Sequence, residues 1–282
     1  MSLLHRELGS NQIGLGQYNE RLILSLVRRE PGIAKAELAR MTNLTPQTIS
    51  VIVNRFIEDG YIITGEKQRG RVGKPSTGLL LNPEGAFSIG VKIGRRSLDV
   101  ILMAFDGKVI ERDISYHNFP EPAKTVPSIK QSITKMMTLL GSEKVNRLIG
   151  VGLAAPGAIA SWSHEFETPL EMMKAWQEVD IQAEIADFTG RPVSMLNDVS
   201  AACLAELSLN RARHSHDFLY LYVGTFIGGG IVMDGKLLSG FNGNAASLAS
   251  MPLHVARDEA TPAQLLTKAS LRVLEKQVIE KG

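Results

Sequence analysis

The feature that most constrains the fold is a short segment, residues 46–59, whose start and end are both marked in the sequence. Thr45 is a favoured helix N-cap residue, and Pro46 suits the first helical position because its missing N–H would have no partner there. Gly60 can adopt the left-handed conformation that ends a helix. The apolar residues in between recur at i, i+3, i+4, i+7 and i+8, which is one helix face: Ile49, Ile52, Val53, Phe56 and Ile57. The segment therefore predicts a helix with one buried and one exposed face.

Shorter helical patterns precede this segment, and two strand-like runs follow it. Residues 19–29 carry apolar residues on one helix face, and residues 35–41 predict a second helix that a tight turn joins to the third. "YIITGEKQ" (residues 61–68) and "TGLLLN" (residues 77–82) predict the two strands of a hairpin. Three helices followed by a hairpin are the parts of a winged helix-turn-helix, which we expect to occupy residues 1–82.

Polar residues at the start and on the outer side of the third expected helix are candidates for DNA contacts. Modules of this kind insert the helix into the major groove, where short hydroxyl and amide side chains bond base edges or phosphates. The candidates are Thr45, Gln47, Thr48, Ser50, Asn54 and Arg55. The alternative is that these residues form only the solvated face of a small helical domain.

The loop between the two strands, "GEKQRGRVGKPST" (residues 65–77), combines glycines with positive charges. It is not a Walker phosphate loop, because that motif needs a glycine where Gln68 stands and a helix where strand-like residues follow Pro75. As the wing of the module, the loop can place arginine in a narrow minor groove and lysine on flanking phosphates. The residues expected to do so are Lys67, Arg69, Arg71 and Lys74. A basic, solvated linker is the alternative.

Composition agrees with a polyanion-binding module joined to a different body. Residues 1–82 hold 11 Lys and Arg against 7 Asp and Glu, whereas the remaining residues hold 20 against 22. The single cysteine, Cys203, excludes an internal disulfide and a multi-cysteine zinc site and suits a reducing cytoplasm. Neither an apolar run of membrane-spanning length nor a secretion signal is present, so we expect a cytoplasmic chain with no membrane partner.

The rest of the chain reads as an α/β body. Three strand-like runs come first, then helices and strands alternate, and a second round begins near residue 218. Glycine-rich turns follow several strand ends, where ligands bind in such folds. The expected elements are strands at 86–94, 98–105, 108–116, 147–159 and 192–198, helices at 126–140, 182–190 and 200–209, and a hairpin at 218–238.

Four stretches carry a resemblance to a known family: "GVGLAAPGAI" from Gly150, "LNDVSAACLAE" from Leu196, "VGTFIGGGIVMDGKLLSGFNG" from Val223 and the loop "GRVGKPS" from Gly70. The chain resembles ROK-family transcriptional regulators, in which a winged helix-turn-helix is fused to a sugar-kinase-like body of the actin/hexokinase (ribonuclease H-like) type. The resemblance implies two lobes, residues 83–200 and 201–282, regulation of carbohydrate genes, a sugar-like effector, and a homodimer or tetramer. The C-terminus stops within a helical pattern, so we expect an incomplete second lobe.

The resemblance also suggests which chemistry is lost. Kinase members carry D-x-G-G-T-K after the first strand, but here Lys92 replaces the Asp, Arg95 and Arg96 replace the small turn residues, and Phe226 replaces a glycine of the second loop. We therefore expect neither ATP binding nor phosphoryl transfer. The residues expected at the family's effector site are Asn197, Asp198, Ser247 and Gly157, although Asn197 and Asp198 can also simply cap the next helix.

The family's zinc pattern is not matched either. In "GNAASLASMPL" the sequence has Ser247 in place of a sugar-contacting Glu and Ser250 in place of the zinc-ligating His, and "HVARDEATPAQLL" lacks the family's cysteines. We therefore expect no metal and no cofactor. Two alternatives stay open: a sugar kinase that carries an extra module, and a DNA-binding dimer that responds to no small molecule.

Overall fold

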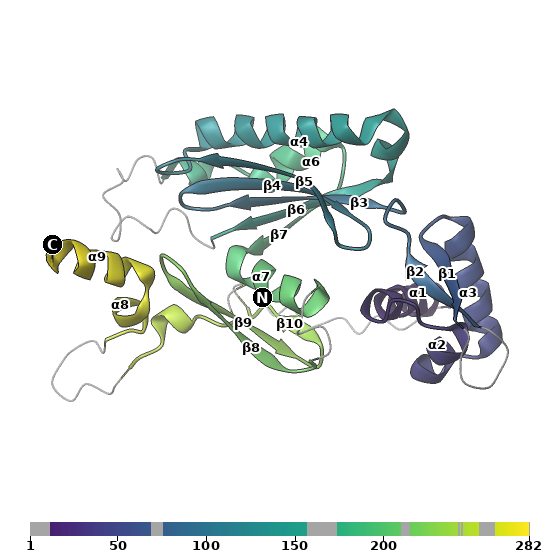
Figure 1. Ribbon diagram of the computed structural model, residues 1–282. Coiled ribbons are helices and arrows are strands. Elements are labelled where there is room, and N and C mark those ends of the chain that lie inside the picture. Colours follow the sequence, from purple (N-terminus) through teal and green to yellow (C-terminus); the bar gives the residue numbers. More distant parts are fainter. Residues whose placement is uncertain are drawn as a thin grey trace. The chain divides into compact units, whose positions relative to one another are not determined.

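The structure is a computed structural model that describes residues 12–68, 76–156, 174–209, 215–241, 243, 245–253 and 263–281 (Figure 1). The chain divides into two compact units. The smaller unit comprises residues 1–87 together with the turn Ala104–Lys108, and the larger unit comprises Ser88–Met103 and the chain from Val109 onward. None of the described helices is both long and apolar enough to cross a membrane.

The smaller unit is a winged helix-turn-helix, as the sequence predicts. Its helices are α1 (Gln12–Arg29), α2 (Lys35–Thr42) and α3 (Pro46–Glu58), and the strands β1 (Ile62–Gln68) and β2 (Ser76–Leu81) pair in an antiparallel hairpin. Gly60 has a φ of 79°, which is the left-handed conformation expected after α3. Helix α1 begins seven residues before the expected start at residue 19. The added turns could not be predicted from a buried apolar face because Leu15 and Tyr18 face solvent.

The core of the smaller unit joins all five of its elements. The residues of this core are Ile23, Leu26, Val27, Ile33, Leu38, Ile49, Ile52, Val53, Phe56, Ile62, Leu79 and Leu81. The turn Ala104–Lys108 belongs to this unit because Phe105 contacts it: the Phe105 ring lies 5.8 Å from the Tyr61 ring, and the Phe105 N–H donates to the carbonyl of Pro83. Tyr61 in turn lies edge-on to Phe56, with ring centroids 6.2 Å apart.

The larger unit contains a five-stranded sheet with the order β5-β4-β3-β6-β7. Its strands are β3 (Phe87–Ile93), β4 (Ser97–Ala104), β5 (Val109–Tyr116), β6 (Leu148–Ala155) and β7 (Val193–Asn197). The helices α4 (Pro122–Lys144) and α6 (Ile181–Thr189) lie on the same face of this sheet (Figure 1). Helix α4 begins four residues before expected, with proline in its first turn, and leaves helical geometry at Gly141, whose φ is 70°.

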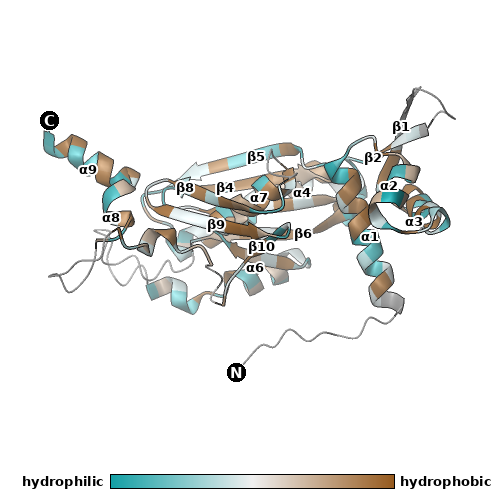
Figure 2. Cartoon of the chain, turned by 90° about the horizontal axis from the view of Figure 1, so that it is seen from below, coloured by the Kyte–Doolittle hydropathy of each residue, from teal (hydrophilic) through white to brown (hydrophobic). Residues whose placement is uncertain are grey.

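A three-stranded sheet with the order β10-β9-β8 follows: β8 (Phe218–Val223), β9 (Ile227–Met233) and β10 (Lys236–Leu238). Helix α7 (Asp198–Leu209) packs so closely on β9 that a Cβ added at Gly230 would lie 2.4 Å from the Cβ of Cys203. Only glycine fits there without a shift. The helices α8 (Leu266–Ala269) and α9 (Leu271–Lys281) follow, and the backbone N–H of Leu271 donates to Gly224, between β8 and β9. Hydrophobic residues concentrate on β4, β8 and β9, whereas α9 shows both kinds (Figure 2).

Candidate functional site

The first turn of α3 is fixed by its own hydroxyl side chains. The Thr45 hydroxyl oxygen accepts a hydrogen bond from the backbone N–H of Thr48 (3.1 Å), and the hydroxyls of Thr45 and Thr48 are 2.9 Å apart. The Ser50 hydroxyl donates to the carbonyl of Pro46 (2.8 Å). The N-cap expected at Thr45 is therefore confirmed. Contacts of these three hydroxyls with DNA stay a prediction.

The outward face of α3 presents Gln47, Val51 and Asn54, which lie at helical spacings of four and three residues and are all exposed. The Asn54 Oδ1 accepts a hydrogen bond from the ammonium of Lys35 on α2 (2.6 Å), which fixes the orientation of the amide. Val51 is 64% exposed, although it stands in a run of buried apolar residues. Val51 was not identified as a candidate from the sequence, although its position outside the i, i+3, i+4 face already indicated that it would be exposed.

Arg55 has a structural partner. Its guanidinium forms an ion pair with the carboxylate of Glu20 on α1 and lies 5.9 Å from the centroid of the neighbouring Phe56 ring. Arg55 therefore ties α3 to α1, and a contact with DNA would need this exposed pair to open. The pair is weak enough for that, because exposed ion pairs contribute only about 0–1 kcal/mol.

The strands of the wing begin and end within one residue of the predicted positions. Lys67 lies in β1 opposite Thr77 of β2, just after an irregularity in the strand pairing that begins at Thr64. The other wing residues that we expect to contact DNA, Arg69, Arg71 and Lys74, lie outside the residues that the structure describes. Their roles stay predictions.

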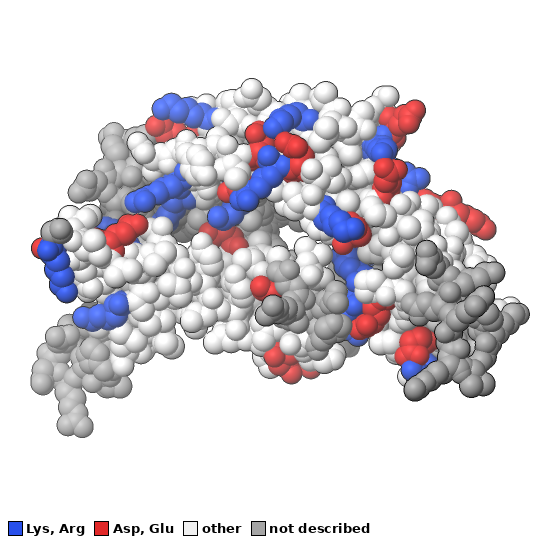
Figure 3. Space-filling view, viewed as in Figure 1, with Lys and Arg blue, Asp and Glu red and all other residues white. Residues whose placement is uncertain are grey.

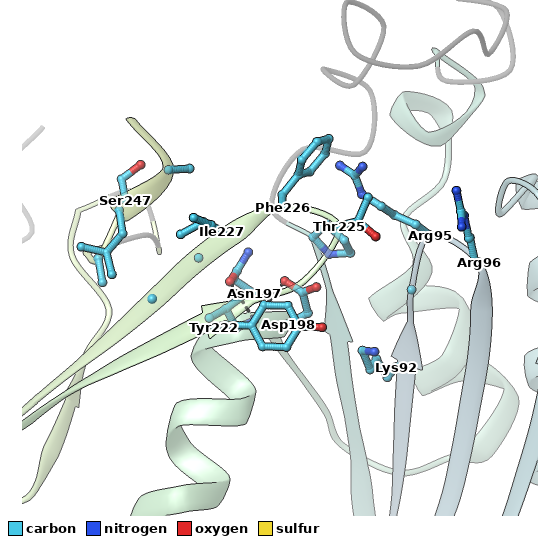
Figure 4. A pocket seen from close by; sticks show the side chains of 18 of the residues that line it. Lys92, Arg95, Arg96, Asn197, Asp198, Tyr222, Thr225, Phe226, Ile227 and Ser247 are labelled. Atoms are coloured by element: carbon cyan, nitrogen blue, oxygen red, sulfur yellow. Dashed lines mark hydrogen bonds between the residues drawn. The ribbon is translucent and has the colours of Figure 1, made fainter. Parts of the chain in front are cut away.

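The larger unit holds a cavity of about 310 Å³ (Figure 4). Four segments that are far apart in the sequence supply most of its lining: the end of β3 with the turn to β4, the junction of β7 and α7, the hairpin between β8 and β9, and residues 246–249. The structure thus brings together three of the four expected effector residues, Asn197, Asp198 and Ser247. The fourth, Gly157, lies outside the described residues.

Asn197 and Asp198 both cap α7 and face the cavity. The Asn197 Oδ1 accepts from the N–H groups of Val199 (3.0 Å) and Ser200 (3.3 Å), and the Asp198 Oδ1 accepts from Val199 (2.9 Å). The capping role and the cavity position therefore coexist. Burial raises the pKa of the Asp198 carboxyl, and the Val199 N–H and the positive charge of Lys92 partly oppose this rise.

Positive charge borders the same cavity. The turn after β3 is held by the Gly94 N–H, which donates to the Ser97 carbonyl (2.8 Å), and by the His117 ring, whose Nε2 lies 3.0 Å from the Gly94 oxygen. This turn carries Arg95, whose guanidinium carbon lies 3.4 Å from the centroid of the Phe226 ring, and Arg96. Figure 3 shows Lys and Arg side chains gathered at this end of the sheet, close to α9.

The residues at the family's expected zinc position do not fit that metal. Ser250, which stands in place of the zinc-ligating His, is the last residue of a short 3₁₀ helix, Leu248–Ser250, and a hydroxyl is not the thiolate or imidazole ligand of structural zinc. Cys203 is buried on α7. Across the described part of the chain, no group of three or more His, Cys, Asp or Glu side chains could hold a metal ion. The absence of a metal from the working protein stays a prediction.

Comparisons with known proteins agree with both units. Residues 17–63 match a model for winged helix-turn-helix DNA-binding domains, and residues 88–262, more than half of the chain, match the model of the ROK family. A similar curated protein is the xylose repressor of Bacillus spizizenii, which is 25% identical over 249 residues, covering 86% of this chain and 62% of the repressor. The chain thus spans less than two thirds of that relative.

Two solved structures share the fold. The first is the crystal structure of a ROK family transcriptional regulator described as a homologue of the E. coli MLC protein, with a TM-score of 0.69 and 22% identity over 95% of this chain and 68% of that one. The second is the ROK hexokinase of Thermus thermophilus, with a TM-score of 0.53 and 23% identity over 69% of this chain and 63% of that one. The matched family model, together with this shared fold, shows that the chain belongs to the ROK family.

Proposed function

We propose that the chain is a DNA-binding transcriptional regulator, a repressor of carbohydrate uptake or metabolism genes, whose body binds a sugar-like effector. The observation that carries this proposal is the outward face of α3, where Gln47, Val51 and Asn54 are exposed on a helix with a fixed N-terminal turn. In a helix-turn-helix, this face enters the major groove. The similarity to a xylose repressor supports the class of target gene.

The work is divided between domains in this proposal. Residues 1–82 bind double-stranded DNA, and the two lobes of the body, residues 83–200 and 201–282, bind the effector and associate into a homodimer or tetramer in the cytoplasm. DNA is contacted by Thr45, Gln47, Thr48, Ser50, Asn54, Arg55, Lys67, Arg69, Arg71 and Lys74. The effector is contacted by Asn197, Asp198, Ser247 and Gly157.

Three residues of α3 have different roles in reading bases. The amide of Gln47 can bond both N6 and N7 of an adenine, which is the pairing that discriminates adenine in the major groove. Val51 can contact only apolar surface, and the C5-methyl group of thymine is the apolar surface that this groove offers. Asn54 keeps its NH₂ group for an acceptor because Lys35 occupies its oxygen.

Selection of duplexes from a random library by the full chain tests the proposal. Two wings and two α3 helices in a twofold dimer predict a pseudo-palindromic site with half-sites one or two helical turns apart. For roughly eight phosphate contacts, the logarithm of affinity should fall with a slope of about −7 against the logarithm of salt concentration. Absent binding, or binding that does not depend on salt, would overturn the proposal.

A sugar kinase is the second candidate, and one observation favours it: Asp198 lies in the cavity with a raised pKa, as a catalytic base can. Against it, Lys92, Arg95 and Phe226 bring bulk and positive charge where kinases of the family carry an acidic residue and small turn residues. We therefore propose no enzymatic role and no cofactor. Sugar-dependent ATP turnover that Asp198→Asn abolishes would establish the kinase instead.

A regulator without an effector is the remaining candidate. A thermal-shift screen of the full chain against sugars, polyols and sugar acids separates it from an effector-controlled regulator. A ligand at 100 times its dissociation constant stabilises the folded chain by about 2.7 kcal/mol, which such a screen detects.

A further inference from the structure

The described lining of the cavity in the larger unit carries a surplus of positive charge. Lys92, Arg95 and Arg96 line it together with a single carboxylate, that of Asp198. All three cations come from the end of β3 and the turn that follows it. A ligand without charge would leave this surplus to be balanced by solvent ions alone, so the lining favours an anion.

The two arginines and the hydrogen-bonding groups occupy different parts of the cavity. In Figure 4, Arg95 and Arg96 lie on one side, Ser247 lies on the opposite side, and Asn197 and Asp198 lie between them. The negative charge of Asp198 disfavours an anion in the middle of the cavity, whereas its oxygens accept hydrogen bonds from hydroxyl groups. The arrangement therefore matches a ligand whose charge is at one end and whose hydroxyls are in the middle.

The cations differ in how firmly they are held. Arg95 is half-buried, and the flat face of its guanidinium lies over the Phe226 ring. Lys92 is exposed and makes no hydrogen bond with a residue that the structure describes, although its positive charge acts on the Asp198 carboxyl. Among the described residues, the ion-pair partner of the exposed Arg96 side chain is Glu275, which is also exposed and lies 4.0 Å away. Lys92 and Arg96 can thus take up an anionic group at little cost in lost contacts.

We propose that the effector is a monosaccharide-sized polyol that bears one anionic group, either a carboxylate or a phosphate. Lys92 and Arg96 bind the anionic group beside Arg95, while Asn197 and Asp198 bind hydroxyls. The volume of about 310 Å³ is at the lower end of the range for ligand pockets, which favours a ligand of this size over a nucleotide. This inference rests on the proposed function, since it names the class of effector.

Isothermal titration calorimetry of the full chain tests this class of effector. The four probes are glucose, glucuronate, glucose 6-phosphate and inorganic phosphate. We expect glucuronate or glucose 6-phosphate to bind, and glucose and inorganic phosphate to bind at least about tenfold more weakly, because each lacks one of the two recognised parts. Binding of glucuronate alone identifies a sugar acid, and binding of glucose 6-phosphate alone identifies a phosphate ester. Glucose that binds as tightly as both anions, or anions that fail to bind at millimolar concentration, would overturn the inference.

Variants locate the anion. Lys92→Gln and Arg96→Gln should each lower the affinity for the sugar anion by about 10- to 100-fold, as expected when a charged hydrogen-bond partner is lost. Both side chains are exposed, so the variants should fold. Lys236→Gln, at an exposed lysine of β10 outside the cavity, is the matched control and should bind as the wild type does. Equal losses in all three variants would mean that the anion binds elsewhere.

The affinity of wild-type chain for its selected duplex, measured without sugar in the same preparation, separates two kinds of failure. Duplex binding combined with no response to any sugar anion contradicts only the anionic effector. Absent duplex binding contradicts the proposed function itself, whatever the calorimetry shows.

Discussion

The guanidinium carbon of Arg95 lies 3.4 Å from the centroid of the Phe226 ring. Arg95 stands in the turn between β3 and β4, and Phe226 stands in the hairpin between β8 and β9, so this contact joins two segments that are far apart in the sequence. A cation over an aromatic face contributes about 0.5–2 kcal/mol, depending on how far it is desolvated. The contact therefore helps to fix the distance between two walls of the cavity.

Replacing Phe226 tests this contact. Phe226→Leu keeps an apolar side chain but removes the aromatic face, and it should lower the free energy of unfolding by about 1 kcal/mol or more. Urea titration followed by circular dichroism measures the change. Phe241→Leu is the matched control, since Phe241 is 92% exposed and its replacement should have little effect. Equal effects of the two substitutions would show that the Arg95 contact contributes nothing to stability.

The N-cap of α3 gives a second prediction. Thr45→Ala removes the oxygen that accepts from the Thr48 N–H and should cost about 1 kcal/mol, equivalent to about fivefold faster amide exchange in α3. Hydrogen exchange followed by mass spectrometry reads this segment separately from the rest of the chain. Thr45→Ser keeps the acceptor and should exchange as the wild type does. An unchanged exchange rate in Thr45→Ala would mean that the cap does not stabilise the helix.

The fold of the smaller unit could be predicted because each element carries its own local signal. Thr45, Pro46 and Gly60 mark the ends of α3, and the period of its buried residues identifies the inner face. The extension of α1 to Gln12 carries no such signal, since Leu15 and Tyr18 are exposed. The inclusion of Phe105 in the smaller unit rests on packing between distant segments, which a single sequence does not encode locally.

The site could be predicted only in part for the same reason. Asn197, Asp198 and Ser247 were expected from motif resemblance, and the structure brings them to one cavity. The stacking of Arg95 on Phe226 depends on how the two hairpins approach each other, so residue identities alone did not reveal it. The exposure of Val51 was not predicted, because a valine in an apolar run is usually buried and only the helix geometry shows this one to be exposed.

A third prediction concerns the pH dependence of stability. Burial raises the pKa of Asp198 in the folded chain above its unfolded value of about 3.9, so its stabilising contribution is complete below that value and is lost as pH rises through the folded pKa. Asp198→Asn removes the charge of this partly buried side chain and keeps an oxygen for the Val199 N–H. The variant should therefore melt at a higher temperature than the wild type at neutral pH, and the difference should vanish toward about pH 4.

Melting curves of both proteins between these pH values test this prediction. The control is Asp187→Asn, at an exposed aspartate of α6. A gain in melting temperature that is the same at every pH, or that appears equally in the control, would mean that the partly buried charge of Asp198 is not its cause.

A fourth prediction concerns Val51 and a thymine methyl group. Replacing the contacted thymine of a selected duplex by deoxyuridine removes only that methyl, and the wild type should lose about fourfold in affinity, as for one buried methyl group of about 0.8 kcal/mol. Val51→Ala should abolish this loss, because the contact no longer exists. Val109→Ala, at an exposed valine of β5, should retain it. If Val51→Ala lost as much affinity as the wild type when thymine is replaced by deoxyuridine, a contact between Val51 and the thymine methyl would be excluded.

Discrimination between duplexes tests the central claim, which is that α3 reads base sequence. Fluorescence anisotropy at one fixed salt concentration gives the affinity of the full chain for a selected duplex and for a scrambled duplex of the same composition. We predict that the selected duplex binds about 10³-fold tighter or more, that Gln47→Ala reduces this ratio at least tenfold, and that Gln277→Ala, on the exposed surface of α9, leaves it unchanged. Equal affinity of the wild type for the two duplexes would contradict the account.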